Sequence, residues 1–327
     1  MKVIVSDCDH ASMEIEEKVF SEAGLGFEKF DCRTEQDMIH RCAGADIILN
    51  QYGPLTERVF AALAPDLRMI VRYGVGVDHI DLDAATRHGV LVCHVPDYGM
   101  NEVSDHALGL MFALERKIPM MVQSSSKGHW DYRYAIPLRR IKDLTIGVLG
   151  VGRIGRLFAL KAMAFGARVI LCDPFNPDLR KQIPRAEQVT FEELLEDSDV
   201  VSIHCPLSKE TRGLIGAEQI ARMKPGALLI NTARGGIVDE QALADALASG
   251  TLGGAGIDTV EHEPISPTSP LLALDNCLVT PHMAWYSEES AREMKRKVAD
   301  EAIRFARGEP AQFPLNRPNI ATRRVSR

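Results

Sequence analysis

The segment from Asp143 to Asp173 constrains the fold more than any other part of the sequence. It reads DLTIGVLGVGRIGRLFALKAMAFGARVILCD: a short apolar run, three glycines in G-x-G-x-x-G spacing, a helical apolar pattern, and a second apolar run that ends in an acid. This order predicts a strand, a tight turn, a helix and a second strand, which together form a βαβ unit. A chain built around such a unit is expected to form an open parallel sheet covered by helices.

Each residue of the glycine motif has a distinct physical role. Gly150 permits the tight turn, Gly152 lets a pyrophosphate approach the backbone, and Gly155 allows the helix and strand to pack closely. The start of the helix offers free N–H groups and a partial positive charge to phosphates. Asp173 can accept hydrogen bonds from a ribose 2′-hydroxyl but would repel a 2′-phosphate. The segment therefore predicts a dinucleotide site that favours NAD over NADP.

The composition limits the class of protein. The length of 327 residues predicts two domains, and 46% hydrophobic residues can fill two cores. A net charge of −7 argues against a surface for nucleic acid or for an anionic membrane. No apolar run approaches the ~18 residues of a membrane span, and the opening MKVIVSD predicts a strand rather than a signal peptide. The seven cysteines are scattered without metal-ligand spacing, which predicts reduced thiols in a cytoplasmic protein and no metal.

The first hundred residues alternate short apolar runs with helical patterns. The runs KVIVS, DIILN, MIVRYG and VLVCHV predict strands, and helices are expected at 13–23, 57–63 and 82–88. This alternation predicts a second open parallel sheet. The cluster Asp7-Cys8-Asp9-His10 holds metal-ligand residue types, but four consecutive residues on a turn cannot all converge on one ion. We interpret that cluster as structural.

Two longer helices are predicted outside these alternating units. The helical pattern at 101–122 is expected to begin at an N-cap, Asn101, and to cross between the domains. The amphipathic pattern at 287–307 is expected to carry the chain back onto the first domain. The polar and aromatic segment SSSKGHWDYRY predicts an arm or interface loop with Trp130 as a packing anchor, and the basic tail TRRVSR is expected to be disordered.

Polar residues follow the predicted strands of the second half of the chain. The runs VVSIHC, ALLIN, GAGI and LVT are followed or ended by Pro206, Arg234, Asp258 and His282. In an open α/β sheet, ligands bind beyond the carboxyl ends of the strands. These side chains are therefore expected at the same edge as the glycine loop.

Three residues near that edge suit hydride transfer between a nicotinamide and a carbonyl group. His282 can donate a proton to the carbonyl oxygen, and the planar guanidinium of Arg234 matches a carboxylate. Glu263 follows Asp258 by five residues and could hold the imidazole tautomer and favour the imidazolium; the adjacent His262 is interpreted as a surface residue. Alone, His282 would be a structural histidine and Arg234 a surface cation. Behind a dinucleotide loop, they predict a catalytic set.

The sequence resembles the D-isomer-specific 2-hydroxyacid dehydrogenase family over nearly its whole length. The segments GVLGVGRIG with Asp173, NTARGGIVDE, GIDTVEHEP and TPHMAW stand in that family's order and spacing. The resemblance implies an α/β fold of two doubly wound parallel-sheet domains. A Rossmann NAD-binding domain at 100–286 would be inserted in a flavodoxin-like substrate domain at 1–99 and 287–327. It also implies a homodimer formed through the NAD-binding domain and a small 2-oxo or 2-hydroxy acid as substrate.

The same resemblance implies roles for individual residues. It implies catalytic roles for Arg234, Glu263 and His282. It implies NAD contacts at Gly150, Gly152, Arg153, Ile154, Gly155, Asp173, Cys205, Pro206, Thr211, Thr232, Ala233, Asp258 and His282. It implies substrate contacts at Arg234 and at the backbone of Val75 and Gly76, and the branch described next adds Arg72, at the substrate carboxylate, and Trp285.

A narrower likeness is to the C-terminal-binding-protein branch of the family, whose eukaryotic members are NAD(H)-sensing corepressors. The segments VRYGVGVDHID and AWYSEESAREMKRK carry it. In that branch the residue matching Trp285 lines the active site, which would favour a 2-oxo acid with a medium apolar side chain. Two alternatives to a D-2-hydroxyacid dehydrogenase stay open: a corepressor-like binding protein that senses NAD(H), and a phosphoglycerate dehydrogenase. The latter needs cations for a phosphate, for which Arg72 is a candidate.

Overall fold

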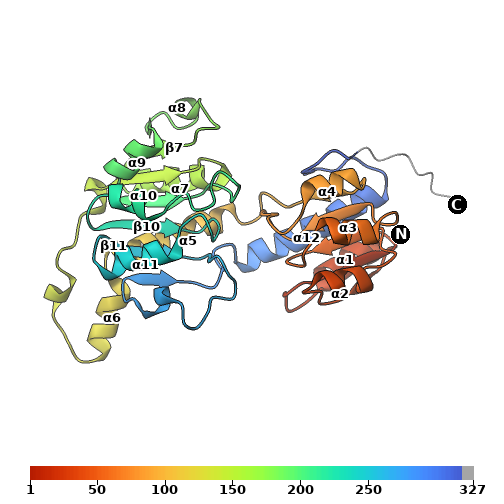
Figure 1. Cartoon of the computed structure of the whole chain (residues 1–327), viewed down its shortest axis with the longest axis horizontal. Helices are drawn as coiled ribbons and strands as arrows, with labels where there is room; N and C mark the ends of the chain where they lie inside the picture. The colour runs from red at the N-terminus through yellow and green to blue at the C-terminus, as the bar shows by residue number, and fades with distance from the viewer. Residues whose placement is uncertain (319–327) are drawn as a thin grey trace. The chain divides into compact units, whose positions relative to one another are not determined.

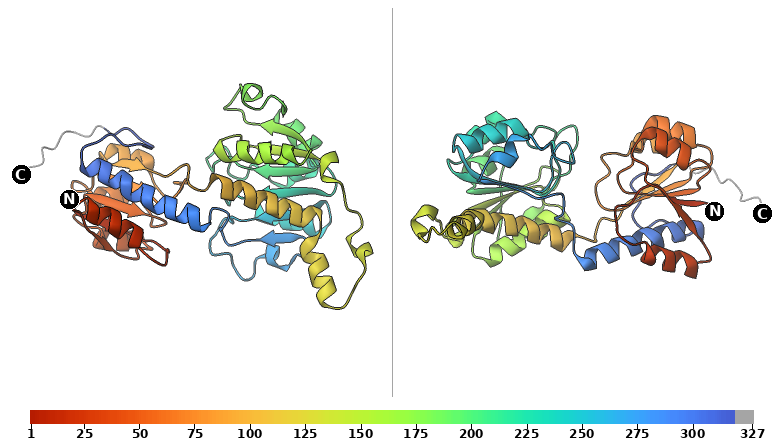
Figure 2. Two further views of the ribbon diagram at one scale, coloured as in Figure 1. Left: turned by 180° about the vertical axis from the view of Figure 1, so that it is seen from behind. Right: turned by 90° about the horizontal axis from the view of Figure 1, so that it is seen from below.

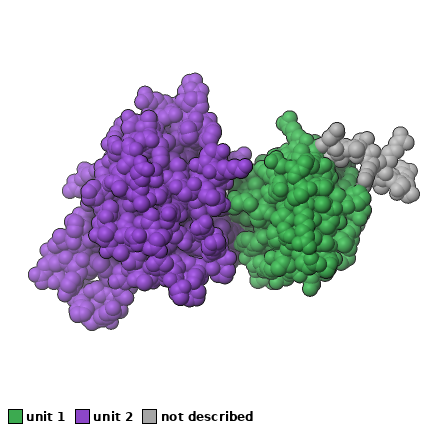
Figure 3. Space-filling view, viewed as in Figure 1, with its two compact units in different colours: residues 1–99, 287–327 green, residues 100–286 purple. Residues whose placement is uncertain are grey.

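The structure is a computed structural model that describes residues 1–318, and its chain forms two compact units (Figures 1 and 3). Unit 1 comprises residues Met1–Gly99 together with the described part of the segment from Ser287 onward, and unit 2 comprises Met100–Tyr286. The tail TRRVSR lies outside the described residues, so its disorder stays a prediction. None of the helices in residues 1–318 combines the length and apolar character that crossing a bilayer requires.

Unit 1 is built on a parallel sheet of five strands in the order β2-β1-β3-β4-β5. Its strands are β1 (Val3–Val5), β2 (Phe27–Lys29), β3 (Ile47–Asn50), β4 (Met69–Arg72) and β5 (Leu91–Cys93). This 2-1-3-4-5 order is that of flavodoxin-like folds, which confirms the predicted class. The sheet is buried on both faces, as the continuous apolar runs predict: on the inner strands β3 and β4, Ile48 and Ile70 on one face and Ile47 and Met69 on the other are completely buried.

Five helices within the described residues cover this sheet. They are α1 (Glu14–Glu22), α2 (Glu35–Arg41), α3 (Glu57–Leu63), α4 (Leu82–Arg87) and α12 (Glu288–Ala306). The predicted helices agree with α1, α3, α4 and α12 to within one or two residues. The sequence interpretation missed β2, an edge strand with exposed residues, and α2, although a Thr34–Asp37 capping box marks the start of α2. Figure 2 shows α12 lying along α1, with which it packs.

Unit 2 is built on a parallel sheet of seven strands in the order β12-β11-β10-β9-β6-β7-β8. Its strands are β6 (Thr145–Leu149), β7 (Arg168–Cys172), β8 (Glu187–Gln188), β9 (Val200–Ile203), β10 (Ala227–Asn231), β11 (Leu252–Ile257) and β12 (Cys277–Val279). Counted from β8, this is the Rossmann order 3-2-1-4-5-6 with one further strand. The chain reverses its direction of travel across the sheet between β6 and β9, where ligands of such folds bind.

Helices cover both faces of this sheet (Figure 2). They are α5 (Met100–Glu115), α7 (Arg153–Ala164), α9 (Phe191–Asp197), α10 (Ala217–Arg222) and α11 (Glu240–Ala248). The short helix α8 (Leu179–Gln182) lies beside the edge strand β8, and α6 (Ile118–Ser126) packs on α5 and has no buried residue. Helices α5 and α7 pack together on one face, whereas α9, α10 and α11 pack in succession on the other.

Two predictions about the segment from 100 to 122, its single helix and its N-cap, are wrong. The helix predicted at 101–122 is two helices, because Lys117 adopts a left-handed conformation with φ of 49° and ends the first one. The first helix begins at Met100, one residue before the predicted cap. Pro119 lies in the first turn of the second helix, where its missing N–H interrupts no hydrogen bond. Trp130 is 92% exposed in the single chain, so its role as a packing anchor of an interface loop stays a prediction.

Candidate active site

The glycine loop between β6 and α7 is shaped by close backbone packing. Gly150 has a φ of +86°, and a Cβ there would lie 2.5 Å from the backbone nitrogen of Cys205. A Cβ on Gly155 would overlap the carbonyl oxygen of Gly150. At Gly152, the N-cap of α7, a Cβ would meet nothing within 4 Å among the described residues, so the space beside it is open. The loop thus leaves room for a phosphate at the start of a helix that carries no acid in its first turn.

Asp173 stands at the end of β7 and faces this loop. Its carboxylate accepts hydrogen bonds from the backbone N–H of Val151, at 2.9 Å, and from that of Phe175, at 3.0 Å. The acid of the dinucleotide motif, Asp173, is therefore hydrogen-bonded directly to the glycine loop. An acid held at this position suits the hydroxyl groups of a ribose.

The loops after β9 and β10 supply further residues implied to contact NAD: Cys205, Pro206, Thr211, Thr232 and Ala233. Thr211 donates a hydrogen bond from Oγ1 to the carbonyl oxygen of Pro206, at 2.7 Å, which closes the loop after β9. Burial raises the pKa of the Cys205 thiol to about 11, so this thiol is neutral near pH 7. Oγ1 of Thr232 is buried and has no hydrogen-bond partner within residues 1–318. A buried hydroxyl of this kind fits a position that contacts a bound cofactor.

The predicted acid–base residues follow three neighbouring strands. Arg234 follows β10, Asp258 follows β11 and His282 follows β12, and these strands are adjacent and parallel. Their carboxyl ends therefore meet at one edge, the edge that also carries the glycine loop after β6. The Arg234 turn is held by Asn231, whose amide group donates to the Arg234 carbonyl oxygen at 2.8 Å and accepts from the Ala233 N–H at 3.0 Å.

His282 and Glu263 form the pair that the sequence predicts. The imidazole Nδ1 lies 2.7 Å from Glu263 Oε2, and Glu263 Oε1 accepts a hydrogen bond from the backbone N–H of Val260 at 3.2 Å. The carboxylate thus holds the proton of Nδ1 and leaves Nε2 for a substrate. His262 is exposed, as predicted.

The backbone at His282 is held in an uncommon conformation. Its φ is 51°, a left-handed value that is rare for residues other than glycine. The buried carboxylate of Asp258 supports the loop by accepting hydrogen bonds from Thr280 Oγ1 at 2.6 Å and from the N–H groups of Met283 and Ala284 at 3.0 Å. Conformations of this kind concentrate at functional sites, where surrounding contacts maintain them.

The sequence interpretation missed His106, which belongs to this network. Its Nε2 lies 3.0 Å from Thr280 Oγ1 and 3.6 Å from Asp258 Oδ1. His106 lies inside helix α5, far from the strand ends in sequence, and no local pattern distinguishes it from a helix surface residue.

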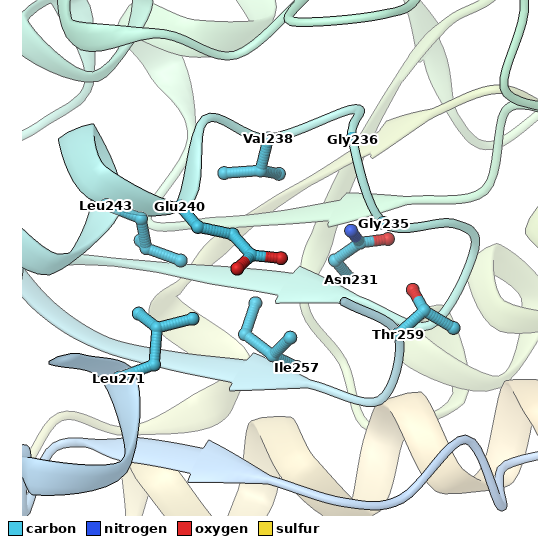
Figure 4. Close-up of a pocket in the computed structure, with 9 residues that line it drawn as sticks. All are labelled: Asn231, Gly235, Gly236, Val238, Glu240, Leu243, Ile257, Thr259 and Leu271. Atoms are coloured by element: carbon cyan, nitrogen blue, oxygen red, sulfur yellow. The ribbon is translucent and has the colours of Figure 1, made fainter. Parts of the chain in front are cut away.

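The loop that carries Arg234 and the loop that carries Glu263 contact each other beside a small cavity (Figure 4). Glu240, the first residue of α11, accepts a hydrogen bond from the backbone N–H of Glu261 at 2.6 Å. Gly235 lies so close to Val260 that a Cβ would overlap the Val260 carbonyl group. The cavity is lined by Asn231, Gly235, Gly236, Val238, Glu240, Leu243, Ile257, Thr259 and Leu271. These contacts connect the backbone that carries Arg234 to the backbone that carries Glu263.

The implied substrate contacts fall in both units. In unit 1, Arg72 is buried and ends β4, and Val75 and Gly76 follow it on a turn in which Gly74 has a φ of +124°. His94 Nδ1 lies 2.8 Å from the Val75 carbonyl oxygen. In unit 2, the half-buried ring of Trp285 packs edge-on against that of Tyr286, with centroids 5.5 Å apart.

Comparison with known proteins shows the family to which the chain belongs. Residues 108–284 match the family described as D-isomer specific 2-hydroxyacid dehydrogenase, NAD binding domain. A glyoxylate reductase of Korarchaeum cryptofilum is 40% identical over 274 residues, which cover 83% of this chain and 82% of that protein. A D-3-phosphoglycerate dehydrogenase of Methanocaldococcus jannaschii is 36% identical over 328 residues, which cover 100% of this chain but 62% of that longer protein.

A solved structure shares the fold across nearly the whole chain. It is an acyclic imino acid reductase in complex with NADPH and D-Arg, with a TM-score of 0.88, 29% identity, and coverage of 97% of this chain and 100% of that one. The fold, the glycine loop and the sequence matches agree with one another. The chain belongs to the D-isomer-specific 2-hydroxyacid dehydrogenase family.

Proposed function

We propose that the protein is an NAD-dependent oxidoreductase that interconverts a 2-oxo acid and a D-2-hydroxy acid. The observation that carries the proposal is the 2.7 Å contact between His282 Nδ1 and Glu263 Oε2 at the sheet edge that also bears Arg234 and the glycine loop. A histidine held in one tautomer by a carboxylate is an arrangement suited to moving a proton at a reacting oxygen.

The residues have distinct roles in this proposal. When NADH is bound, it supplies a hydride to the carbonyl carbon of the 2-oxo acid. His282 donates a proton from Nε2 to the carbonyl oxygen, and Glu263 stabilises the imidazolium form that does so. Arg234 binds the substrate carboxylate and polarises the carbonyl group. In the reverse direction, His282 accepts the proton of the hydroxyl group.

The sequence resemblance supplies the binding roles in this proposal. The glycine loop and the first turn of α7 take the pyrophosphate, and Asp173 takes a ribose. The remaining NAD contacts come from Arg153, Ile154, Cys205, Pro206, Thr211, Thr232, Ala233 and Asp258. In unit 1, the Arg72 side chain and the backbone of Val75 and Gly76 bind the substrate carboxylate.

The proposal is tested by following NADH oxidation with glyoxylate, hydroxypyruvate, phenylpyruvate and 4-methylthio-2-oxobutyrate. We expect at least one to be reduced to the D-hydroxy acid. His282→Ala and Arg234→Ala should each lower kcat by about 10²- to 10⁴-fold while NADH still binds. His262→Ala, which changes an exposed histidine twenty residues away, is the matched control. Failure to reduce any 2-oxo acid, or unchanged rates in both variants, would refute the proposal.

We further propose that Trp285 selects a 2-oxo acid with a medium apolar side chain, as in the C-terminal-binding-protein branch. Trp285→Ala should raise KM for phenylpyruvate more than for glyoxylate, because glyoxylate has no side chain to contact. A phosphoglycerate dehydrogenase activity is the alternative suggested by the 36% identical relative. It would require efficient turnover of 3-phosphohydroxypyruvate, and loss of that turnover in Arg72→Ala.

A homodimer through the NAD-binding unit is also proposed. The segment between α6 and β6 exposes large apolar side chains: Trp130, Tyr132, Tyr134, Ile136 and Leu138. Exposed apolar patches of this kind are typical of protein interfaces. Light scattering should report a dimer, and Trp130→Ser should weaken it. A dimer that forms only with NADH, together with peptide binding retained in Arg234→Ala, would instead favour the corepressor-like alternative.

The cysteines support a reducing compartment, and we propose a cytoplasmic location on that basis. All seven are free thiols and six are buried. Proteins of oxidising compartments more often pair their cysteines in disulfides.

A further inference from the structure

Unit 1 contains a buried cluster of charged and polar groups. Glu16 on α1 is completely buried, Lys295 on α12 is 7% exposed and Tyr73, just after β4, is 1% exposed. The Tyr73 hydroxyl donates a hydrogen bond to Glu16 Oε1 at 3.1 Å, and Lys295 Nζ lies 3.5 Å from Glu16 Oε2. Lys295 also donates to the carbonyl oxygen of Ser12, in the loop before α1.

Burying these charged groups costs desolvation free energy, so the cluster is expected to have a structural or functional role. Burial raises the pKa of the Glu16 carboxyl, and the Lys295 ammonium and the Tyr73 hydroxyl oppose that shift. A buried ion pair seldom adds net stability compared with apolar residues of similar size. It does, however, define the positions of its members closely, because breaking it leaves an uncompensated buried charge.

The member whose position matters for the proposed function is Tyr73. It directly follows Arg72 and precedes the turn that contains Val75 and Gly76. The backbone N–H of Tyr73 donates to the Asn50 carbonyl oxygen at 2.8 Å, and its ring packs edge-on against His10 with centroids 5.7 Å apart.

The residues after Tyr73 have little side-chain anchorage of their own. Gly74 and Gly76 have no side chain, and Val75 is 37% exposed. Glycine-containing turns have many accessible conformations, so this turn depends on its anchors. His94 Nδ1 and the Val95 N–H contact the carbonyl oxygens of Val75 and Gly74, and the start of the turn is held at Tyr73. Tyr73 is such an anchor, and its hydroxyl is held by a charge cluster that joins α1 to α12.

We propose that Glu16 and Lys295 are positioning residues, which act through the Tyr73 hydroxyl to hold the Arg72–Gly76 turn in the conformation that binds the substrate carboxylate. The inference rests on the proposed function for its link to substrate. Its structural part, the ordering of the turn, does not depend on that function.

The experiment compares Tyr73→Phe, Lys295→Met and the matched control Arg296→Met. Tyr73→Phe removes only the hydroxyl group. Lys295→Met removes the buried cation, whereas Arg296→Met removes a neighbouring cation on the same helix whose side chain is 72% exposed. Two kinds of measurement are made. Steady-state kinetics give kcat and KM for the best 2-oxo acid, and amide hydrogen exchange is followed in a peptide spanning residues 72–78.

We expect KM to rise about tenfold in Tyr73→Phe and in Lys295→Met, the effect of losing one well-placed hydrogen bond to a charged group. Values of kcat should stay within about twofold, because carboxylate binding is the same in the ground and transition states. Exchange of the 72–78 peptide should become faster while exchange elsewhere is unchanged. Arg296→Met should match the wild type in both measurements.

The outcomes separate this inference from the proposed function. If no 2-oxo acid is reduced by the wild type, the proposed function fails, yet the exchange measurement still tests the ordering of the turn. Unchanged exchange in folded Tyr73→Phe overturns the inference, and so does faster exchange with an unchanged KM. A uniform loss of protection across unit 1, with a lower kcat at constant KM, indicates a purely structural role and also overturns it. If Lys295→Met does not fold, Tyr73→Phe alone decides.

Discussion

Gly235 packs directly against the carbonyl group of Val260, so closely that a Cβ at residue 235 would overlap it. This contact joins the turn that carries Arg234 to the loop that carries Glu263, the partner of His282. The relative positions of Arg234, the proposed substrate-binding cation, and of the proposed acid–base pair thus depend on the absence of one side chain.

Substitution of this glycine should therefore damage activity strongly. In Gly235→Ala, the added methyl group must separate the two loops, and displacements near 1 Å at an active site reduce rates by about 10²-fold. We expect kcat/KM for the best 2-oxo acid to fall by at least that factor. Gly109→Ala is the control, because Gly109 lies in helix α5 with nothing within 4 Å of its added Cβ, and alanine favours a helix. Wild-type kinetics in Gly235→Ala would show that the loops are not coupled.

The Glu240 carboxylate should act on the same loops through a hydrogen bond. It accepts from the Glu261 N–H at 2.6 Å, two residues before Glu263. Glu240→Ala should lower kcat about fivefold to tenfold, the effect of one hydrogen bond of ~1 kcal/mol, with KM for NADH unchanged. Glu240→Gln keeps an acceptor oxygen and should recover most of the rate. Gln241→Ala, one position along the helix, serves as the control; an equal loss in that variant would assign the effect to α11 as a whole.

Asp173 should set the choice between NAD and NADP. Asp173→Asn removes the negative charge but keeps an oxygen for the Val151 N–H, which Asp173 binds at 2.9 Å. The ratio of kcat/KM for NADH to that for NADPH should fall about tenfold, equivalent to ~1.4 kcal/mol. Asp178→Asn changes an exposed acid in the following loop and should leave the ratio unaltered. Equal use of NADH and NADPH by the wild type would contradict this role for Asp173.

His204 should make stability depend on pH in the acid range. Burial lowers its pKa from 6.5 to about 3. Nε2 of its ring lies 2.9 Å from Ser202 Oγ, and the ring packs against Phe158. Below pH 6.5 the unfolded chain binds a proton at this residue that the folded chain does not bind. The contribution of neutral His204 to the free energy of unfolding is therefore complete above pH 6.5. It is lost as the pH falls from 6.5 towards 3.

The slope expected from this one residue is at most ~1.4 kcal/mol per pH unit. It can be measured as the difference in the free energy of unfolding by urea between pH 6.5 and pH 4.5, in wild type and in His204→Asn. The variant should show a shallower decline than the wild type. His129→Asn, at an exposed position, should not change the slope. Parallel curves for wild type and His204→Asn would show that His204 is protonated in the folded protein.

Much of the fold follows from local patterns in the sequence. Apolar runs between glycines predict buried parallel strands, because a strand covered on both faces must be apolar throughout. Helix starts such as those at Asp239 and Ser287 can be predicted from the sequence, because an N-cap contact joins residues only two or three positions apart. The strand β2 is short and exposed and so lacks an apolar run, and α2 has a cap but only one buried residue, Met38. The break at Lys117 is a backbone conformation without an adjacent glycine or proline.

For the site, the sequence by itself determined which chemical groups stand at the ends of parallel strands: the glycine loop, Asp173, Arg234 and His282. This inference works because parallel strands bring their carboxyl ends to one edge. Only the tertiary structure decided how those groups are held. The His106–Thr280–Asp258 network, the packing of Gly235 on Val260 and the buried Glu16–Lys295 pair each join segments far apart in the chain. Such contacts depend on the positions of two distant segments at once, and no local pattern of residues records them.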